Sequence, residues 1–110
     1  MPPDTILIVD DEESIRKSLA DILRDEGHEV ASAASGREAL DLLAEMQPSL
    51  ALLDIAMPDL SGTDVLRELK QIDADMECIM LTGYETLETA RAAVRYGASE
   101  YLSKPFDVFS

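Results

Sequence analysis

The most constraining feature of this sequence is a regular alternation of short β-rich runs with segments of helical periodicity, which extends over nearly all of its 110 residues. This alternation is typical of βαβ units built around a parallel sheet. The near-continuous apolar runs 5–9, 50–53 and 78–81 predict central strands that are covered on both faces. The shorter and more polar runs 29–33 and 100–103 predict strands nearer the sheet edges. We therefore expect a doubly wound α/β fold with five parallel strands and helices on both faces.

Helical segments are expected between the strands, each identified by an apolar stripe. The first stripe ends at Gly27, a suitable left-handed C-cap. The second helix begins with a capping box formed by Ser35 and Glu38, and it is expected to run to Met46 before Pro48 stops it. The stripes consist of Ile15, Leu19, Ile22 and Leu23; of Ala39, Leu40, Leu43 and Met46; of Val65, Leu66, Leu69 and Ile72; and of Leu87, Ala90, Ala93 and Val94.

The chain is expected to fold as one domain over residues 1–110, with its core over 5–106 and a short tail at 107–110. Hydrophobic residues make up 46% of the sequence, which is enough for a packed core. Only residues 106–110 follow Pro105, too few for another full-length helix. We therefore expect the final helix to be truncated or missing. An under-covered sheet face of this kind predicts a partner, a homodimer or domain-swapped oligomer, or a truncated chain.

The charge of the chain restricts its partners. Nine Lys and Arg residues against 23 Asp and Glu residues give a net charge of −14, which repels a polyanionic backbone. We therefore expect no direct nucleic-acid binding, and instead a divalent cation or a basic partner. Cys78 is the only cysteine, and the sequence has no signal-peptide or membrane-span pattern, so a cytoplasmic protein without disulfides is expected.

Chemically informative residues stand directly after the predicted strands. Asp10 and Asp11 follow the first strand, and Asp54 ends the third. Thr82 ends the fourth strand, and Lys104 follows the fifth. Because the functional crevice of an open parallel sheet lies beyond the carboxyl ends of its strands, three carboxylates, a hydroxyl and an ammonium are expected at one edge.

Crowded carboxylates repel one another unless a cation such as Mg²⁺ neutralises them. A carboxylate can also attack a phosphoryl group and form an aspartyl phosphate. Asp54 is the best-placed nucleophile, because a central strand would hold it rigidly. Asp10 and Asp11 would then anchor the cation, while Thr82 and Lys104 would bind the phosphoryl oxygens.

These residues resemble the response regulator receiver domain of two-component signalling. The matching segments cover residues from about 5 to 106 and are Ile8-Val9-Asp10-Asp11-Glu12, Leu53-Asp54-Ile55-Ala56-Met57-Pro58 with Gly62, Leu81-Thr82-Gly83, and Ser103-Lys104-Pro105-Phe106. The resemblance implies a flavodoxin-like sheet of order 2-1-3-4-5.

The resemblance also implies a mechanism. A histidine kinase or histidine phosphotransfer protein would donate a phosphoryl group to Asp54, and the domain would catalyse this transfer and a slow autodephosphorylation. The backbone carbonyl of Ala56 would join the Mg²⁺ ligands. Thr82 and Tyr101 would form the switch, which changes the surface of the fourth helix and fifth strand. That surface would control an effector domain or a downstream protein, most often in transcription.

Several of these residues also have plainer interpretations. Residues 10–13 could form a solvated acidic turn at a helix N-terminus. Thr82 could bond locally to the backbone, and Tyr101 could be half-buried packing. His28 is interpreted as structural and Cys78 as a small buried hydrophobic residue.

Two other functions compete with the phosphorylated switch. A phosphatase of the haloacid dehalogenase type needs a second acid two residues after its nucleophile, and here that position is Ala56. The remaining alternative is a receiver-like interaction or dimerisation module that is not phosphorylated, which would be expected to have lost part of the acidic pocket or the lysine.

Overall fold

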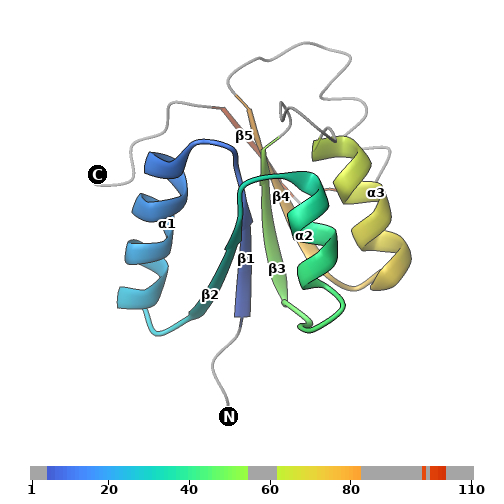
Figure 1. The fold of residues 1–110 in the computed structure, drawn as a ribbon, viewed down its shortest axis with the longest axis horizontal. Coiled ribbons are helices and arrows are strands. Elements are labelled where there is room, and N and C mark those ends of the chain that lie inside the picture. Colours follow the sequence, from blue (N-terminus) through green and yellow to red (C-terminus); the bar gives the residue numbers. More distant parts are fainter. Residues whose placement is uncertain (1–4, 55–61, 83–97, 99, 104–110) are drawn as a thin grey trace.

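The computed structural model describes residues 5–54, 62–82, 98 and 100–103. Its elements, in chain order, are β1 Thr5–Val9, α1 Glu13–Asp25, β2 Glu29–Ala33, α2 Gly36–Leu42, β3 Leu50–Asp54, α3 Gly62–Ile72, β4 Glu77–Thr82 and β5 Glu100–Ser103 (Figure 1). The strands form one five-stranded parallel sheet in the order β2-β1-β3-β4-β5. The predicted strands, their parallel pairing and the order implied by the resemblance are confirmed.

Two predicted helices fall outside the described residues. The expected fourth helix around 87–94 is one of them. The truncated or missing final helix is the other, because the described part of the chain ends at Ser103. Both stay predictions, and so does the homodimer or domain-swapped oligomer that was inferred from the chain end.

The two faces of the sheet are covered by different helices, as the alternation of side chains along β1 requires. Ile6 and Ile8 pack on the face covered by α1, in a cluster that includes Ala20. Leu7 and Val9 point to the opposite face, which α2 and α3 cover (Figure 1). None of the described helices is long and apolar enough to cross a membrane.

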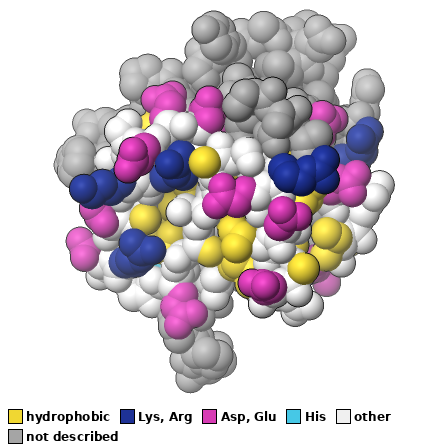
Figure 2. Space-filling model, in the orientation of Figure 1, with side chains coloured by type: hydrophobic (Ala, Val, Ile, Leu, Met, Phe, Trp, Pro, Cys, Tyr) yellow, Lys and Arg dark blue, Asp and Glu magenta, His cyan; other side chains and the backbone are white. Residues whose placement is uncertain are grey.

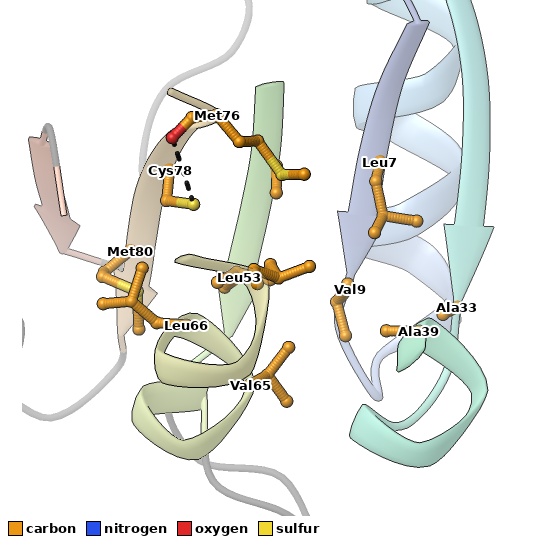
Figure 3. Close-up of a cluster of buried hydrophobic side chains, with 12 residues drawn as sticks. Leu7, Val9, Ala33, Ala39, Leu53, Val65, Leu66, Met76, Cys78 and Met80 are labelled. Carbon is orange, nitrogen blue, oxygen red and sulfur yellow. Dashed lines mark hydrogen bonds between the residues drawn. The ribbon is translucent and has the colours of Figure 1, made fainter. Parts of the chain in front are cut away.

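The larger cluster of buried side chains lies between the sheet and the pair α2 and α3, and Figure 3 shows how its side chains face one another. Strand residues and helix residues contribute to it from both sides, since Leu53 lies on β3 and Leu66 on α3. Its members are Leu7, Val9, Ala33, Ala39, Ala51, Leu53, Val65, Leu66, Leu69, Met76, Cys78 and Met80. This packing fixes β1 and β3 side by side at the centre of the sheet.

The C-terminus of α1 is closed by the predicted glycine. Gly27 has a φ of 94°, a left-handed conformation that favours glycine. Its N–H donates to the carbonyl of Arg24 at 3.0 Å, and the N–H of His28 donates to the carbonyl of Leu23 at 3.1 Å. This pair of bonds is a Schellman motif, and it places His28 directly before β2, away from the carboxyl ends of the strands. The structural interpretation of His28 fits this position.

The N-terminus of α2 carries the predicted capping box. The N–H of Glu38 donates to Ser35 Oγ at 3.2 Å, and Glu38 Oε2 accepts from the N–H of Ala34 at 3.1 Å. The predicted end of this helix was wrong, because α2 stops at Leu42 rather than continuing to Met46. Two hydrogen bonds of the 3₁₀ type form the turn that follows. The N–H of Ala44 donates to the carbonyl of Asp41, and the N–H of Glu45 donates to the carbonyl of Leu42.

Substituting Ser35 with Ala is expected to lower the free energy of unfolding by about 1 kcal/mol, because the side-chain acceptor at the start of α2 is lost. Urea unfolding followed by circular dichroism measures this change. Ser14→Ala is the matched control, since Ser14 is exposed inside α1 and alanine suits a helix interior. Equal urea midpoints for the Ser35→Ala variant and the wild type would show that the cap contributes nothing.

The single cysteine lies inside the larger cluster and is expected to be unreactive in the folded protein. Burial raises the pKa of the Cys78 thiol from 9.0 to about 11. The thiolate is the reactive form, so Ellman's reagent at pH 8 should label the native protein at least about 100-fold more slowly than the urea-unfolded protein. Equally fast labelling of the native and unfolded protein would contradict the buried position.

Candidate functional site

The strand register places Asp10 and Asp54 next to each other at one edge of the sheet. Val9 on β1 pairs with Leu53 on β3, so the two aspartates occupy the following position on neighbouring parallel strands. Both residues are buried, with Asp10 0% and Asp54 3% exposed. Two carboxylates side by side beneath the surface are costly unless a cation or hydrogen bonds stabilise their charge. This pair is therefore the strongest indication of function in the structure.

Asp10 is held from both its backbone and its side chain. Its N–H donates to the carbonyl of Ala33 at 3.1 Å, which extends the pairing of β1 with β2 beyond Val9. Its Oδ1 accepts from the N–H of Glu12 at 2.9 Å. These bonds fix the direction in which the loop between β1 and α1 leaves the sheet. The carboxylate of Asp10 thus has a defined position before any ligand binds.

A cluster of three carboxylates follows β1. One carboxylate oxygen each from Asp10, Asp11 and Glu12 lies within 4.8 Å of the others, and only Asp10 is buried while the other two are exposed. Oxygen donors at this spacing fit a hard divalent cation such as Mg²⁺ or Ca²⁺. The donor set therefore suits a divalent cation, and it places the carboxylate of Glu12 beside those of Asp10 and Asp11, two of the four predicted ligands.

Glu12 was not predicted as a possible ligand. In the sequence it is simply the next residue of an acidic run, and such a run is equally typical of a helix start. In the structure Glu12 is the N-cap residue of α1, yet its side chain makes no capping bond, and its carboxylate lies with the two aspartates. The sequence did contain a signal. Glutamate is not among the residues preferred at a helix N-cap, so a glutamate directly before the first helix indicates a role other than capping.

Of the other predicted site residues, the structure describes the backbone of Thr82 and Tyr101. Thr82 is the last residue of β4, one position beyond the partner of Asp54, and it pairs with Ser103 of β5. Tyr101 lies in β5 opposite Met80. Ala56 and Lys104 lie outside the described residues. The sheet register thus brings Asp10, Asp54 and Thr82 to the same edge, while their functional roles stay predictions.

Comparison with known proteins agrees with this arrangement. The family model of the response regulator receiver domain matches residues 6–109. Regulatory protein AtoC of Escherichia coli is 41% identical over 103 residues, which are 94% of this chain and 22% of AtoC. Sporulation initiation phosphotransferase F of Bacillus subtilis is 36% identical over 108 residues, which are 98% of this chain and 87% of that protein. The chain thus spans less than a quarter of AtoC but most of the sporulation phosphotransferase.

Solved structures resemble the whole described fold. A CheY-like receiver domain protein from Methanospirillum hungatei superimposes with a TM-score of 0.93 at 39% identity, covering 96% of this chain and 84% of that one. A response regulator from Burkholderia pseudomallei, solved with a phosphorylated aspartic acid and a calcium ion, has a TM-score of 0.89 at 32% identity, covering 96% and 62%. The response regulator TrrA from Thermotoga maritima, in complex with Mg²⁺-BeF, has a TM-score of 0.84 at 36% identity, covering 94% and 89%.

The family match extends over nearly the whole chain, and the solved structures that superimpose on it include a phosphorylated form and a form with Mg²⁺-BeF. The resemblance noted from the sequence is thereby confirmed. This chain belongs to the response regulator receiver domains, the phosphorylatable switches of two-component signalling.

Proposed function

We propose that residues 1–110 form a single receiver domain that accepts a phosphoryl group on Asp54 from a histidine kinase or a histidine phosphotransfer protein, in the presence of Mg²⁺. The observation that carries this proposal is the burial of Asp54 at the end of a central strand, next in register to the buried Asp10. A nucleophile in this place is held rigidly, and it faces an edge where other carboxylates can hold a cation.

The proposed cation ligands are Asp10, Asp11, Asp54 and the backbone carbonyl of Ala56. The carboxylate cluster after β1 supports the first two, and its geometry allows Glu12 to contribute directly or through water. A bound Mg²⁺ would supply positive charge that offsets the negative oxygens of the transferred group. Proteins similar to this chain were solved with calcium or with Mg²⁺-BeF, which is consistent with a divalent site.

In the proposed transfer, a carboxylate oxygen of Asp54 forms a bond to phosphorus while the bond between phosphorus and the donor imidazole nitrogen breaks. The electron pair of the broken bond stays on that nitrogen, so charge and atoms balance. The Thr82 hydroxyl and the Lys104 ammonium would bind the oxygens of the transferred group. The domain would also catalyse the slow hydrolysis of its own aspartyl phosphate, which makes it a switch rather than an enzyme acting on outside substrates.

The proposed output is a change of surface around Thr82 and Tyr101. Because Thr82 ends β4 and Tyr101 lies in the neighbouring edge strand β5, a movement at the phosphorylated edge can pass between adjacent strands. The surface of β5 and the fourth helix would contact an effector domain or a downstream protein, most often in transcriptional control. AtoC is named a regulatory protein, which is consistent with this output.

The charge of the chain supports a basic protein partner and opposes direct contact with nucleic acid, and the single cysteine is consistent with the cytoplasm. The net charge is −14, and on the face shown in Figure 2 the described acidic and basic side chains are intermingled, without a continuous basic surface. A regulator of transcription built on this domain would therefore contact DNA through another domain or another protein.

Incubation with acetyl phosphate and Mg²⁺, followed by intact-mass measurement, tests the proposal. We expect one added phosphoryl group that hydroxylamine removes and that does not form when a chelator is present, because an acyl phosphate is cleaved by hydroxylamine. A folded sample that gains no adduct from acetyl phosphate or from histidine kinases would contradict the proposal. It would favour the alternative of a receiver-like interaction or dimerisation module that is not phosphorylated.

A further inference from the structure

The loop between β1 and α1 carries the carboxylate cluster, and one cationic side chain of α1 reaches back to it. Arg16 Nη1 donates to the backbone carbonyl of Asp10 at 2.8 Å, and this contact is partly buried. The backbone N–H of Arg16 donates to the carbonyl of Glu12 at 3.1 Å. Arg16 therefore contacts the loop at both ends of the cluster, once through its side chain and once through its backbone.

The contact from Arg16 adds a side-chain donor to the bonds that hold Asp10. The N–H of Asp10 is bonded to Ala33, and its Oδ1 accepts from the N–H of Glu12. The guanidinium bonds its carbonyl from the side of α1. Of these donors and acceptors from outside Asp10 itself, only the guanidinium belongs to a side chain. Substituting Arg16 thus removes one contact to the loop without changing a carboxylate.

We infer that Arg16 is a positioning residue for the cation site, holding the loop so that the carboxylates of Asp10, Asp11 and Glu12 converge. This inference rests on the proposed function, since that function makes the cluster a cation site. Groups that orient metal ligands without touching the metal commonly change metal affinity about tenfold or more when they are removed.

If Arg16 acted only through its charge, removing it would strengthen cation binding instead of weakening it. Arg16 and Lys17 both line the groove between α1 and β2, together with Arg24. Removing any of these positive charges makes the surroundings of the cluster more negative, which strengthens the attraction of a divalent cation. A loss of cation affinity on removal of Arg16 would therefore not come from the loss of its charge, and Lys17 offers a control of equal charge on the same helix.

The test compares the full chain with the variants Arg16→Met, Arg16→Lys and Lys17→Met. Methionine keeps the apolar stem of either side chain and removes its charge and donors. Mn²⁺ serves as the probe, because electron paramagnetic resonance counts the free ion directly. We expect Arg16→Met to weaken Mn²⁺ binding about tenfold, Lys17→Met to leave it unchanged or slightly tighter, and Arg16→Lys to restore part of the affinity with its single ammonium donor.

A second readout needs no metal. In metal-free protein, amide hydrogen exchange measured by NMR should be faster at Asp10 and Glu12 in Arg16→Met, by about tenfold, and unchanged in Lys17→Met. Amides of β1 and β3 serve as the internal reference, because a general loss of stability would accelerate them too.

The outcomes separate this inference from the function on which it rests. Equal Mn²⁺ affinities and equal loop exchange in Arg16→Met and Lys17→Met would overturn the positioning role while leaving the cation site intact. Wild-type protein that binds no Mn²⁺ would contradict the proposed cation site itself. In that case the exchange of the Asp10 and Glu12 amides still decides whether Arg16 holds the loop.

Discussion

Replacing Asp54 with Asn is expected to reduce the phosphoryl adduct formed from acetyl phosphate and Mg²⁺ to below detection. The carboxylate oxygen is the nucleophile in the proposed transfer, and a neutral amide lacks its negative charge. Asn has the same shape as Asp, so the buried site at the end of β3 can hold it. The variant also removes one of two buried neighbouring negative charges, and the fold should therefore be retained.

The matched control for this prediction is Asp41→Asn, which makes the same change at an exposed position of α2. It should form as much adduct as the wild type. Circular dichroism and thermal melting would establish that both variants are folded. An adduct of undiminished yield in the Asp54→Asn variant would mean that another residue is the acceptor, and the proposed site would then be wrong.

Truncating Leu66 to Ala should lower the free energy of unfolding by about 3 kcal/mol, because a fully buried leucine leaves a cavity when it is shortened. Leu66 is 0% exposed and belongs to the cluster between α3 and the sheet (Figure 3). Domains of this size have a total stability of only about 5–15 kcal/mol, so this is a large fraction. Urea unfolding gives the change from the midpoint and slope.

The control lies on the same helix. Ile72 is 59% exposed, so Ile72→Ala removes an aliphatic side chain of equal size that contributes little to the core. It should change stability by less than about 0.5 kcal/mol, and alanine's helix propensity opposes even that loss. Similar losses in the two variants would show that α3 does not pack on the sheet as described.

The central strands were predictable because their apolar runs are nearly continuous, whereas the order of the five strands came only from the family resemblance. Residues 5–9 and 50–53 have no polar face, and in the structure they are the adjacent central strands β1 and β3. The glycine at position 27 and the capping box at Ser35 were also predictable, since each depends on residues within one turn. Features that depend only on neighbouring residues can be predicted from the sequence without knowledge of the fold.

The end of α2 was not predictable from its apolar stripe. Leu43 and Met46 continue the helical spacing. The helix nevertheless ends at Leu42, and a turn leads from it to the buried Pro48 and to β3. The N–H groups of Ala44 and Glu45 bond to carbonyls three residues earlier, and the spacing of the apolar residues does not predict this change of hydrogen bonding.

The placement of the candidate site residues at one edge of the sheet was predictable, whereas the geometry of the loop that follows β1 was not. The rule that function lies beyond the carboxyl ends of parallel strands identified Asp10, Asp54 and Thr82. The contact from Arg16 to Asp10 depends on how α1 turns back over the loop, a rotation that no residue type specifies. Likewise, the position of Glu12 within the carboxylate cluster follows from the loop conformation rather than from its place in an acidic run.

The most direct measurement of the central claim is the location of the phosphoryl group in wild-type protein. Sodium borohydride reduces an aspartyl phosphate to homoserine, and peptide mass spectrometry then identifies the converted residue. The account predicts homoserine at position 54 alone, in Mg²⁺-dependent yield. Homoserine at Asp10 or Asp11, or a borohydride-resistant phosphoryl group on His28, would contradict it.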